Sequence, residues 1–401
     1  MEIKQALIDS VTGAYIETYI RKQGITQDDG NKGQDTLYWV NELLEKKELD
    51  VNKFQEFLFE ELFWGKRKAI RFYKIDNIRK IKYLEDWKDP LVEKYGIESL
   101  DFINILEQQN IPENEKRIVA IKHSSNEKGE LTNIKLLYCY GGRTSDYEKT
   151  TLSYVPVEID FKQKIMTLKV WNRNGIVESE RSGDVVGNTY SDLISTFKVK
   201  TASFGFSGKE TLYTMSLGLI KDIYTKVPNY NLIENLKNAT DMYIKEIHRE
   251  LKLENLEERN GELVIKRGVI DIEDELKNQI EKIVISDYFF NRSYENIWKM
   301  GVDSIIARIR FNDKEHVLTS MSGDNSERPI FCTKTFLALK KSLEDASVVE
   351  RLWIETKREN GRLRIKYDAS CGEYLEILIL SNIRFKERDL KLAWEMYKKY
   401  E

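Results

Sequence analysis

The sequence predicts a multidomain α+β protein with a helical N-terminal region, an antiparallel β meander, a helical middle and a C-terminal α+β module with a β-hairpin. Its 401 residues exceed one ordinary core, since domains usually hold about 100–200 residues. Amphipathic patterns in 1–110 indicate helices, and alternating apolar runs between 117 and 171 indicate antiparallel strands. The expected domains are 1–112, mainly helical with a basic hairpin; 113–210, antiparallel β; 211–270, a helical connector; and 271–401, α+β.

The best-bounded N-terminal helix is predicted in the segment DVNKFQEFLFEELFWG. Asp50 or Asn52 is placed to act as its N-cap, and Gly65 is placed to end it. The Gly- and Asp-rich stretch 22–35 has the composition of an exposed, mobile loop between helices. The residues expected on the apolar face of the helix are Phe54, Phe57, Leu58 and Leu62.

The centre of the chain changes to period-two patterning, which is typical of strands. A long helix is expected at 231–258, and another begins at Asp271. Two strands, a helix near 334–343, a hairpin at 352–367 and a strand at 374–380 follow. The four runs of the expected meander are 117–125, 131–140, 152–161 and 165–171. A final helix is expected to place Leu390, Ala393, Trp394 and Tyr397 on one face.

Composition indicates a folded protein and names no partner. Hydrophobic residues make up 41% of the chain and only 5 residues are Pro, so long disordered linkers are not expected. A formal net charge of −3 means that nucleic acid would have to bind a local basic surface. We expect a cytoplasmic protein with reduced cysteines and no membrane association. The start of the chain does not read as a secretory signal, and no apolar run is long enough to span a bilayer.

The strongest candidate for catalysis lies in LWIETKRENGRLRIKY (352–367). Glu355 and Lys357 have the Glu-x-Lys spacing of half of a metal-dependent nuclease site. A nuclease also needs an acid on a neighbouring strand to share the metal, and neither Asp345 nor Asp313 is placed there. We therefore favour a charged hairpin with no catalytic residues and no cofactor, and keep catalysis by Glu355 and Lys357 with Mg²⁺ as the alternative.

Hairpin geometry supplies the structural interpretation of the same residues. The Asn-Gly pair at 360–361 is the preferred two-residue type I′ turn. That turn would set Glu355 opposite Lys366 and Lys357 opposite Arg364. The Glu-x-Lys pair is then explained as part of a solvated, partly charge-complementary face.

Other motifs have simpler structural interpretations. The acidic run 271–275 is favourable at a helix N-terminus, with Asp271 as the cap. The segment 204–211 resembles a phosphate loop, but Ser203 replaces a required Gly and Glu210 replaces the Mg²⁺-binding hydroxyl, so we expect a loop before a helix. The Gly-rich segments 141–146, 182–188 and 321–329 are interpreted as turns. The residues without metal-ligand spacing are His123, His248, His316, Cys139, Cys332 and Cys371.

The best binding signal is the basic segment 64–83, in which one acid, Asp76, is set against eight cations. Aromatic residues are interleaved with them, so the segment could hold phosphates while rings stack on bases, or could bind an acidic protein. The structural alternative is a basic solvated hairpin face. The cations are Lys66, Arg67, Lys68, Arg71, Lys74, Arg79, Lys80 and Lys82.

The element order from 271 to 368 resembles that of the YezG-type immunity proteins of Gram-positive bacteria. The order is helix, strand, strand, helix and hairpin, and Trp353, Gly361, Tyr367 and Asp368 frame the last hairpin, with Trp298 before the first strand. The resemblance covers about a quarter to a third of the chain. It implies a small non-catalytic α+β module that binds a protein such as a toxin.

Two functional hypotheses follow from these patterns. The first is a non-enzymatic bacterial binding protein, an immunity protein or recognition subunit of a toxin, phage-defence or counter-defence system, with a protein partner and possible DNA or RNA contact through 66–82. The second is a divalent-metal nuclease or the nucleic-acid-binding subunit of a defence complex. They differ in whether Glu355 is needed for cleavage or only for stability.

Overall fold

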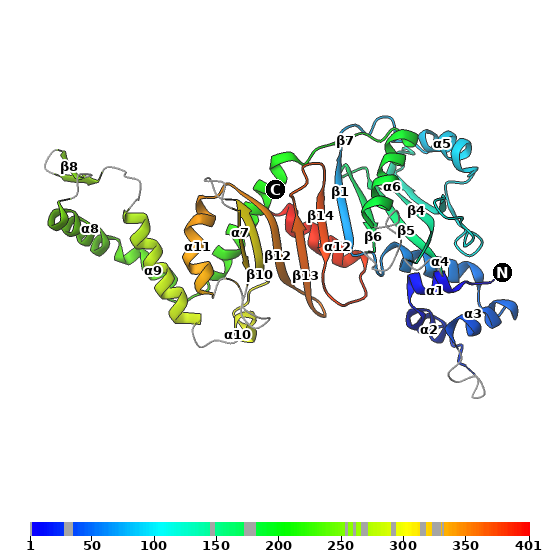
Figure 1. The fold of residues 1–401 in the computed structure, drawn as a ribbon, viewed down its shortest axis with the longest axis horizontal. Coiled ribbons are helices and arrows are strands. Elements are labelled where there is room, and N and C mark those ends of the chain that lie inside the picture. The colour runs from blue at the N-terminus through cyan, green and yellow to red at the C-terminus, as the bar shows by residue number, and fades with distance from the viewer. Residues whose placement is uncertain are drawn as a thin grey trace. The chain divides into compact units, whose positions relative to one another are not determined.

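The structure, a computed structural model, describes residues 2–27, 35–144, 149–171, 182–252, 256–259, 262–265, 272–289, 294–312, 318–322, 330 and 333–401. The chain divides into two compact units. Unit 1 comprises Met1–Gly208 and Ile365–Lys399, and unit 2 comprises Lys209–Arg364 with Tyr400–Glu401. The α+β class is confirmed, because helices and antiparallel strands are both abundant (Figure 1).

Unit 1 combines helices from both of its chain segments with antiparallel strands. Its helices are α1 (Gln5–Val11), α2 (Gly13–Lys22), α3 (Thr36–Glu45), α4 (Val51–Phe63), α5 (Glu85–Tyr95), α6 (Ser182–Phe197) and α12 (Glu387–Lys398). Its strands are β1 (Ala69–Ile75), β2 (Phe102–Ile103), β3 (Lys116–Ser125), β4 (Leu131–Arg143), β5 (Thr150–Asp160), β6 (Ile165–Val170), β7 (Thr201–Ala202) and β14 (Leu375–Ile379).

The sheet of unit 1 has the strand order β14-β1-β6-β5-β4-β3-β2. Strands β3 to β6 are antiparallel neighbours, so the predicted meander is confirmed. Strand β1 pairs with β6 on one side and with β14 on the other, with Ala69 opposite Val170 and also opposite Leu378. Five of the seven residues of β1 are buried, which is typical of a strand covered on both faces.

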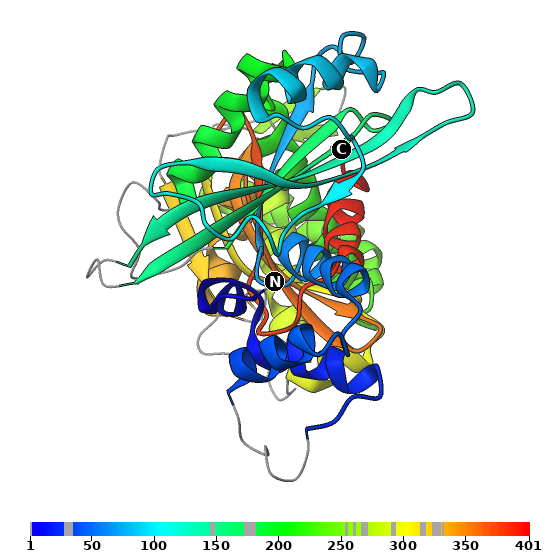
Figure 2. The ribbon, with the colours of Figure 1, turned by 90° about the vertical axis from the view of Figure 1, so that its right-hand side faces the viewer.

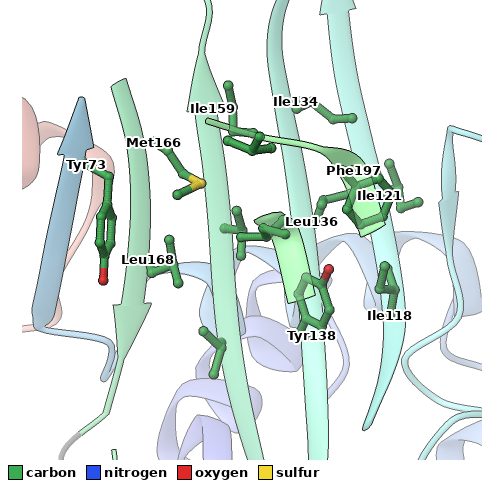
Figure 3. Packing of buried hydrophobic residues seen from close by; sticks show 14 of the residues in the cluster. Tyr73, Ile118, Ile121, Ile134, Leu136, Tyr138, Ile159, Met166, Leu168 and Phe197 are labelled. Atoms are coloured by element: carbon green, nitrogen blue, oxygen red, sulfur yellow. The ribbon is translucent and has the colours of Figure 1, made fainter. Parts of the chain in front are cut away.

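One face of this sheet packs against α5 and α6. Leu136 and Tyr138 of β4 and Met166 and Leu168 of β6 point to this side (Figure 3), as alternation along a strand requires. Phe197 from α6 packs into the same cluster. Each fully buried side chain of this size contributes about 1.5–3 kcal/mol relative to an exposed one.

The other face of the sheet is covered by α1, α4 and α12. Helices α1 and α4 contact β5, and the ring of Phe72 on β1 stacks on Trp394 of α12 with centroids 4.5 Å apart. In Figure 2 the blue N-terminal helices and the light-blue α5 lie on opposite sides of the teal strands. Unit 1 is therefore a helix–sheet–helix arrangement.

Helix α4 begins where the sequence predicts. The Asp50 carboxylate accepts hydrogen bonds from the backbone N–H groups of Asn52 and Lys53, at 3.0 and 3.1 Å. Gly65 follows the helix with φ +27°, and a Cβ there would lie 2.4 Å from the Glu61 carbonyl oxygen. Residues 28–34 of the preceding loop 22–35 lie outside the described residues.

Among its described residues, unit 2 combines a helical group with an antiparallel group of strands and a separate two-stranded antiparallel sheet, β8 with β9. Its helices are α7 (Gly205–Tyr224, of which the first residues belong to unit 1), η3 (Tyr230–Leu236), α8 (Lys237–Leu251), α9 (Ile272–Phe289), α10 (Tyr294–Lys299) and α11 (Lys334–Asp345). Its strands are β8 (Leu256–Arg259), β9 (Glu262–Ile265), β10 (Ser304–Asn312), β11 (Leu318–Ser322) and β12 (Val348–Arg358). Strand β13 (Gly361–Asp368) has residues in both units.

A buried ion pair joins α9 and α11 in unit 2. The Lys340 ammonium lies 2.8 Å from a Glu281 carboxylate oxygen, and the Tyr230 hydroxyl donates to the other oxygen at 3.2 Å. Strand β10 pairs with β11 and β12, so the three strands form one antiparallel group. The ion pair between Glu281 and Lys340 fixes how α9 packs against α11.

Several sequence expectations differ from the structure. The segment 231–258 is not one helix, because η3, α8 and β8 divide it. The segments 182–188 and 204–211 are not loops, since α6 begins at Ser182 and α7 begins at Gly205. The predicted boundary at 210 lies beside the division at Gly208, whereas the boundary at 112 lies inside unit 1 and 271–401 is shared between the units.

Candidate functional site

The basic segment 66–82 forms β1 and the loop after it. It does not form the predicted hairpin, because β1 pairs with β6, β14 and the short β7, which all lie far from it in the sequence. Arg67 is 1% exposed, and its guanidinium donates to the Ser10 carbonyl oxygen at 2.7 Å. Lys66 and Lys68 also donate to backbone carbonyl oxygens, at 2.7 and 2.6 Å. These three cations hold unit 1 together.

The remaining cations of the segment are spread over different surroundings. Arg71 and Lys82 are each ion-paired with a glutamate, and Lys74 lies 4.6 Å from the centroid of an aromatic ring. Arg71 and Lys74 are on opposite faces of β1 because side chains alternate along a strand. Arg79 and Lys80 lie in the exposed loop. The eight residues are therefore not gathered on one binding face.

Glu355 lies on β12 and is 7% exposed. Its carboxylate is 3.7 Å from the Arg362 guanidinium and 3.4 Å from that of Arg364. The Lys357 ammonium donates to the Trp298 carbonyl oxygen at 3.2 Å. Among the described residues, no group of three or more His, Cys, Asp or Glu side chains is placed to hold a metal ion. Glu355 thus lies between cations in the structure.

The turn of this hairpin differs by one residue from the prediction. Residues 359–360 form the turn, and β13 begins at Gly361, which has φ +99°. Lys366, the predicted partner of Glu355, instead places its ammonium 2.7 Å from Asp368. The cations recorded beside the Glu355 carboxylate are thus the arginines Arg362 and Arg364.

Several other predicted positions lie outside the described residues. They include Asp271, the predicted helix cap, and Asp313, as well as parts of the Gly-rich segments 141–146 and 321–329. Cys139 is buried and Cys371 is half-buried, and both are thiols. Asp345 is the last residue of α11, at the helix end where the sequence places it.

A buried lysine that the sequence does not single out lies on β6. Lys169 is fully buried, and its ammonium lies 2.8 Å from the Glu158 carboxylate and 3.9 Å from the centroid of the Trp64 ring. Burial lowers the pKa of Lys169 to about 8. Burial would raise the pKa of Glu158, but the ammonium groups of Lys169 and Lys135 outweigh it and lower the pKa to about 2.

A second buried network surrounds Asp192 on α6, which is 3% exposed. One carboxylate oxygen accepts from the ammonium groups of Lys94 and Lys116, at 2.6 and 2.7 Å. The other accepts from the hydroxyls of Tyr95 and Tyr138, the latter at 3.1 Å. Burial would raise the pKa of Asp192, but these hydrogen bonds lower it. The network joins α5, α6, β3 and β4, which are far apart in sequence.

Unit 2 carries an unusual number of exposed apolar side chains on η3, α8 and α9. Helix α8 buries only Ile244 and His248. Its apolar residues Met242 and Tyr243 are 72% and 58% exposed. A surface helix usually hides its apolar residues on one face. The large apolar side chains that unit 2 leaves exposed on these elements are Leu232, Leu236, Met242, Tyr243, Leu251 and Ile283.

Comparison with known proteins adds no identification. No protein-family model matches the sequence, and no curated protein matches it. Among the described residues, none of the helices is both long enough and apolar enough to span a membrane.

Proposed function

We propose that this chain is a non-enzymatic binding protein of a bacterial conflict system, an immunity protein or a recognition subunit. The observation that carries the proposal is the set of exposed apolar side chains on η3, α8 and α9 in unit 2. Large apolar side chains concentrated on neighbouring elements are typical of a surface that another protein covers. The partner is therefore a protein with a complementary apolar surface.

The arrangement of the helices favours a docking role. Helix α8 contacts η3 and α9, while α9 is fixed by the buried pair of Glu281 and Lys340. A cavity of about 250 Å³ lies between η3, α8 and α9, with Ile233 and Ile280 in its lining. An apolar side chain of a partner could enter it, since central buried anchors carry most of the binding energy at protein interfaces.

Charges around this surface are mixed. Lys237, Asp241 and Lys277 line the cavity, and Lys277 lies 3.8 Å from Glu234. A mixed rim selects against a strongly charged polymer such as nucleic acid, because salt-dependent phosphate binding needs an excess of cations. We therefore place the contact with a protein, and not with DNA or RNA, at this surface.

The test compares capture of partners by the tagged full chain and by two variants. The first variant replaces exposed apolar side chains of α8, and the control replaces exposed apolar side chains of unit 1. The wild type and the control should retain a stoichiometric protein partner, and the first variant should lose it. A partner found in this way is purified and its affinity for each form is measured, because each lost apolar anchor weakens binding by about 1–3 kcal/mol. The first variant is Met242→Ser, Tyr243→Ser and Leu251→Ser; the control is Tyr38→Ser, Tyr83→Ser and Val92→Ser, three exposed apolar positions of unit 1.

Two results would contradict the proposal. A partner bound equally well by both variants would place the contact elsewhere on the chain. Cleavage of DNA or RNA in the presence of Mg²⁺, abolished by Glu355→Gln in a protein that stays folded, would favour the nuclease alternative. A Glu359→Gln protein is the matched control, because Glu359 lies in the turn of the same hairpin.

A further inference from the structure

The surroundings of Lys116 in unit 1 contain two cavities that the binding proposal above does not use. Each has a volume of about 540 Å³, which is within the range of about 300–1,000 Å³ found for small-molecule sites. Lys116 on β3 lines both cavities. The Asp192 carboxylate lies between the two ammonium groups of Lys94 and Lys116 and lines the second cavity.

The first cavity has an excess of positive charge. Lys94, Lys116 and Arg117 line it, and Glu98 is its one lining acid. Asp192 takes up part of this charge, and the exposed Glu115 carboxylate lies 4.0 Å from the Arg117 guanidinium, so a ligand anion would have to displace Glu115 from Arg117. An ammonium has three N–H donors, so Lys116 has further donors to offer a ligand beside its bond to Asp192. A phosphate would complete such a site.

The remaining lining of this cavity suits an aromatic base. Phe102 on the edge strand β2 is half-buried and lines the cavity together with Tyr95, and bases stack on such rings. The amide side chains of Asn104 and Gln108 line the same cavity; Gln108 Oε1 accepts a hydrogen bond from Arg117 at 2.8 Å, and its amide N–H groups are the donors it can offer to a base edge. Cations, rings and amides are thus combined within one small volume.

We propose that this cavity binds a mononucleotide, with its phosphate on Lys116 and Arg117 and its base against Phe102. Asp192 is a positioning residue in this arrangement. It holds the ammonium groups of Lys94 and Lys116 at one carboxylate oxygen, so that both cations are fixed before the ligand arrives. Preorganised donors give affinity because less side-chain entropy is lost on binding. This site lies in unit 1 and does not depend on partner docking by α8.

The test is calorimetric titration of the full chain with AMP, GMP, adenosine and inorganic phosphate. We expect at least one mononucleotide to bind more tightly than either adenosine or phosphate alone. Arg117→Gln should weaken that binding about tenfold or more, because a hydrogen bond to a charged group is lost. Arg117 is exposed, so its loss should leave the fold intact. Lys88→Gln is the matched control, because Lys88 is an exposed lysine of α5 outside the cavity lining.

Phe102→Leu tests the second half of the site. It should weaken nucleotide binding and leave any phosphate binding unchanged, since only the base contacts this ring. The proposal is overturned if no mononucleotide binds at about 1 mM, the weak end of specific affinity. It is also overturned if nucleotide affinity is the same in wild type, Arg117→Gln and Phe102→Leu, because the ligand would then occupy another place.

Discussion

Replacement of Glu158 by Gln tests how strongly one buried ion pair stabilises unit 1. Glu158 Oε2 lies 2.8 Å from the Lys169 ammonium, and Asn133 donates to the other oxygen at 3.1 Å. Gln keeps the size of the side chain and an acceptor for Asn133 but removes the charge. Lys169 is fully buried, so its ammonium would lose its ion-pair partner and lie against the aromatic rings of Phe63 and Trp64.

The magnitude follows from the pKa of Glu158. Its pKa is lowered from 4.5 to about 2, and each pKa unit corresponds to about 1.36 kcal/mol. The carboxylate therefore contributes about 3 kcal/mol to the free energy of unfolding at neutral pH, which agrees with about 3–5 kcal/mol for breaking a buried pair. Lys169 limits the decrease in the free energy of unfolding. Its pKa is already about 8, so it can release its proton and avoid a buried charge without a counter-charge. We expect a cost of about 2–3 kcal/mol.

Urea unfolding of the full chain, followed by circular dichroism, measures this cost from the transition midpoint and slope. Glu42→Gln is the control, because Glu42 forms an exposed i,i+4 pair with Lys46, and such pairs contribute about 0.3–0.5 kcal/mol. Lys169→Met together with Glu158→Gln should recover part of the stability, since no buried charge is left. A cost below about 1 kcal/mol for Glu158→Gln would refute the reasoning.

Further predictions concern pH, the hairpin and two local contacts. The pKa of Glu158 is lowered on folding to about 2, so its stabilisation is present above its unfolded value of about 4.3 and should be lost as pH falls from there towards 2 in acid unfolding curves; Glu158→Gln should flatten this dependence. Glu355→Gln should lower the free energy of unfolding by about 1–2 kcal/mol in urea titrations, because the carboxylate is buried between two partly exposed arginines; no change would show that the pairs are screened. Asp50→Ala should cost about 1 kcal/mol in the same assay by removing the α4 cap, whereas Asp50→Ser should restore most of it. Tyr367→Phe should cost about 1 kcal/mol, because a buried hydroxyl donates to the Ala393 carbonyl at 2.7 Å, and unchanged thermal stability would contradict this.

Local patterns account for the elements that the sequence predicts well. Strands β3 to β6 are runs rich in apolar and β-branched residues, and short Gly- or Lys-containing segments separate them along the sequence, so each strand and its antiparallel neighbour can be assigned from the chain alone. Helix α4 has a cap and an apolar period, and α12 places Leu390, Ala393, Trp394 and Tyr397 in the interior as predicted. In these cases the information lies within about ten residues of chain.

The basic segment shows where local patterns fail. Eight cations between 66 and 82 suggest an exposed face, yet β1 lies between β6 and β14 inside the sheet. Its partner β14 begins about 300 residues later in the chain, so no local feature could indicate that Arg67 is buried. The apolar residues Ile70, Phe72 and Tyr73 within the segment are the one signal of an internal strand.

By itself the sequence determined the α+β class, the four-stranded meander and the helices whose caps and apolar periods are written in consecutive residues. Only the tertiary structure decided which charges are buried together. Asp192 forms ion pairs with Lys94 and Lys116, which precede it in the chain by about 100 and about 75 residues. Glu158 forms an ion pair with Lys169 next to the Trp64 ring. The physical reason is that helix caps and alternation are short-range properties of the backbone, whereas the pairing of buried charges depends on which distant elements exclude water together.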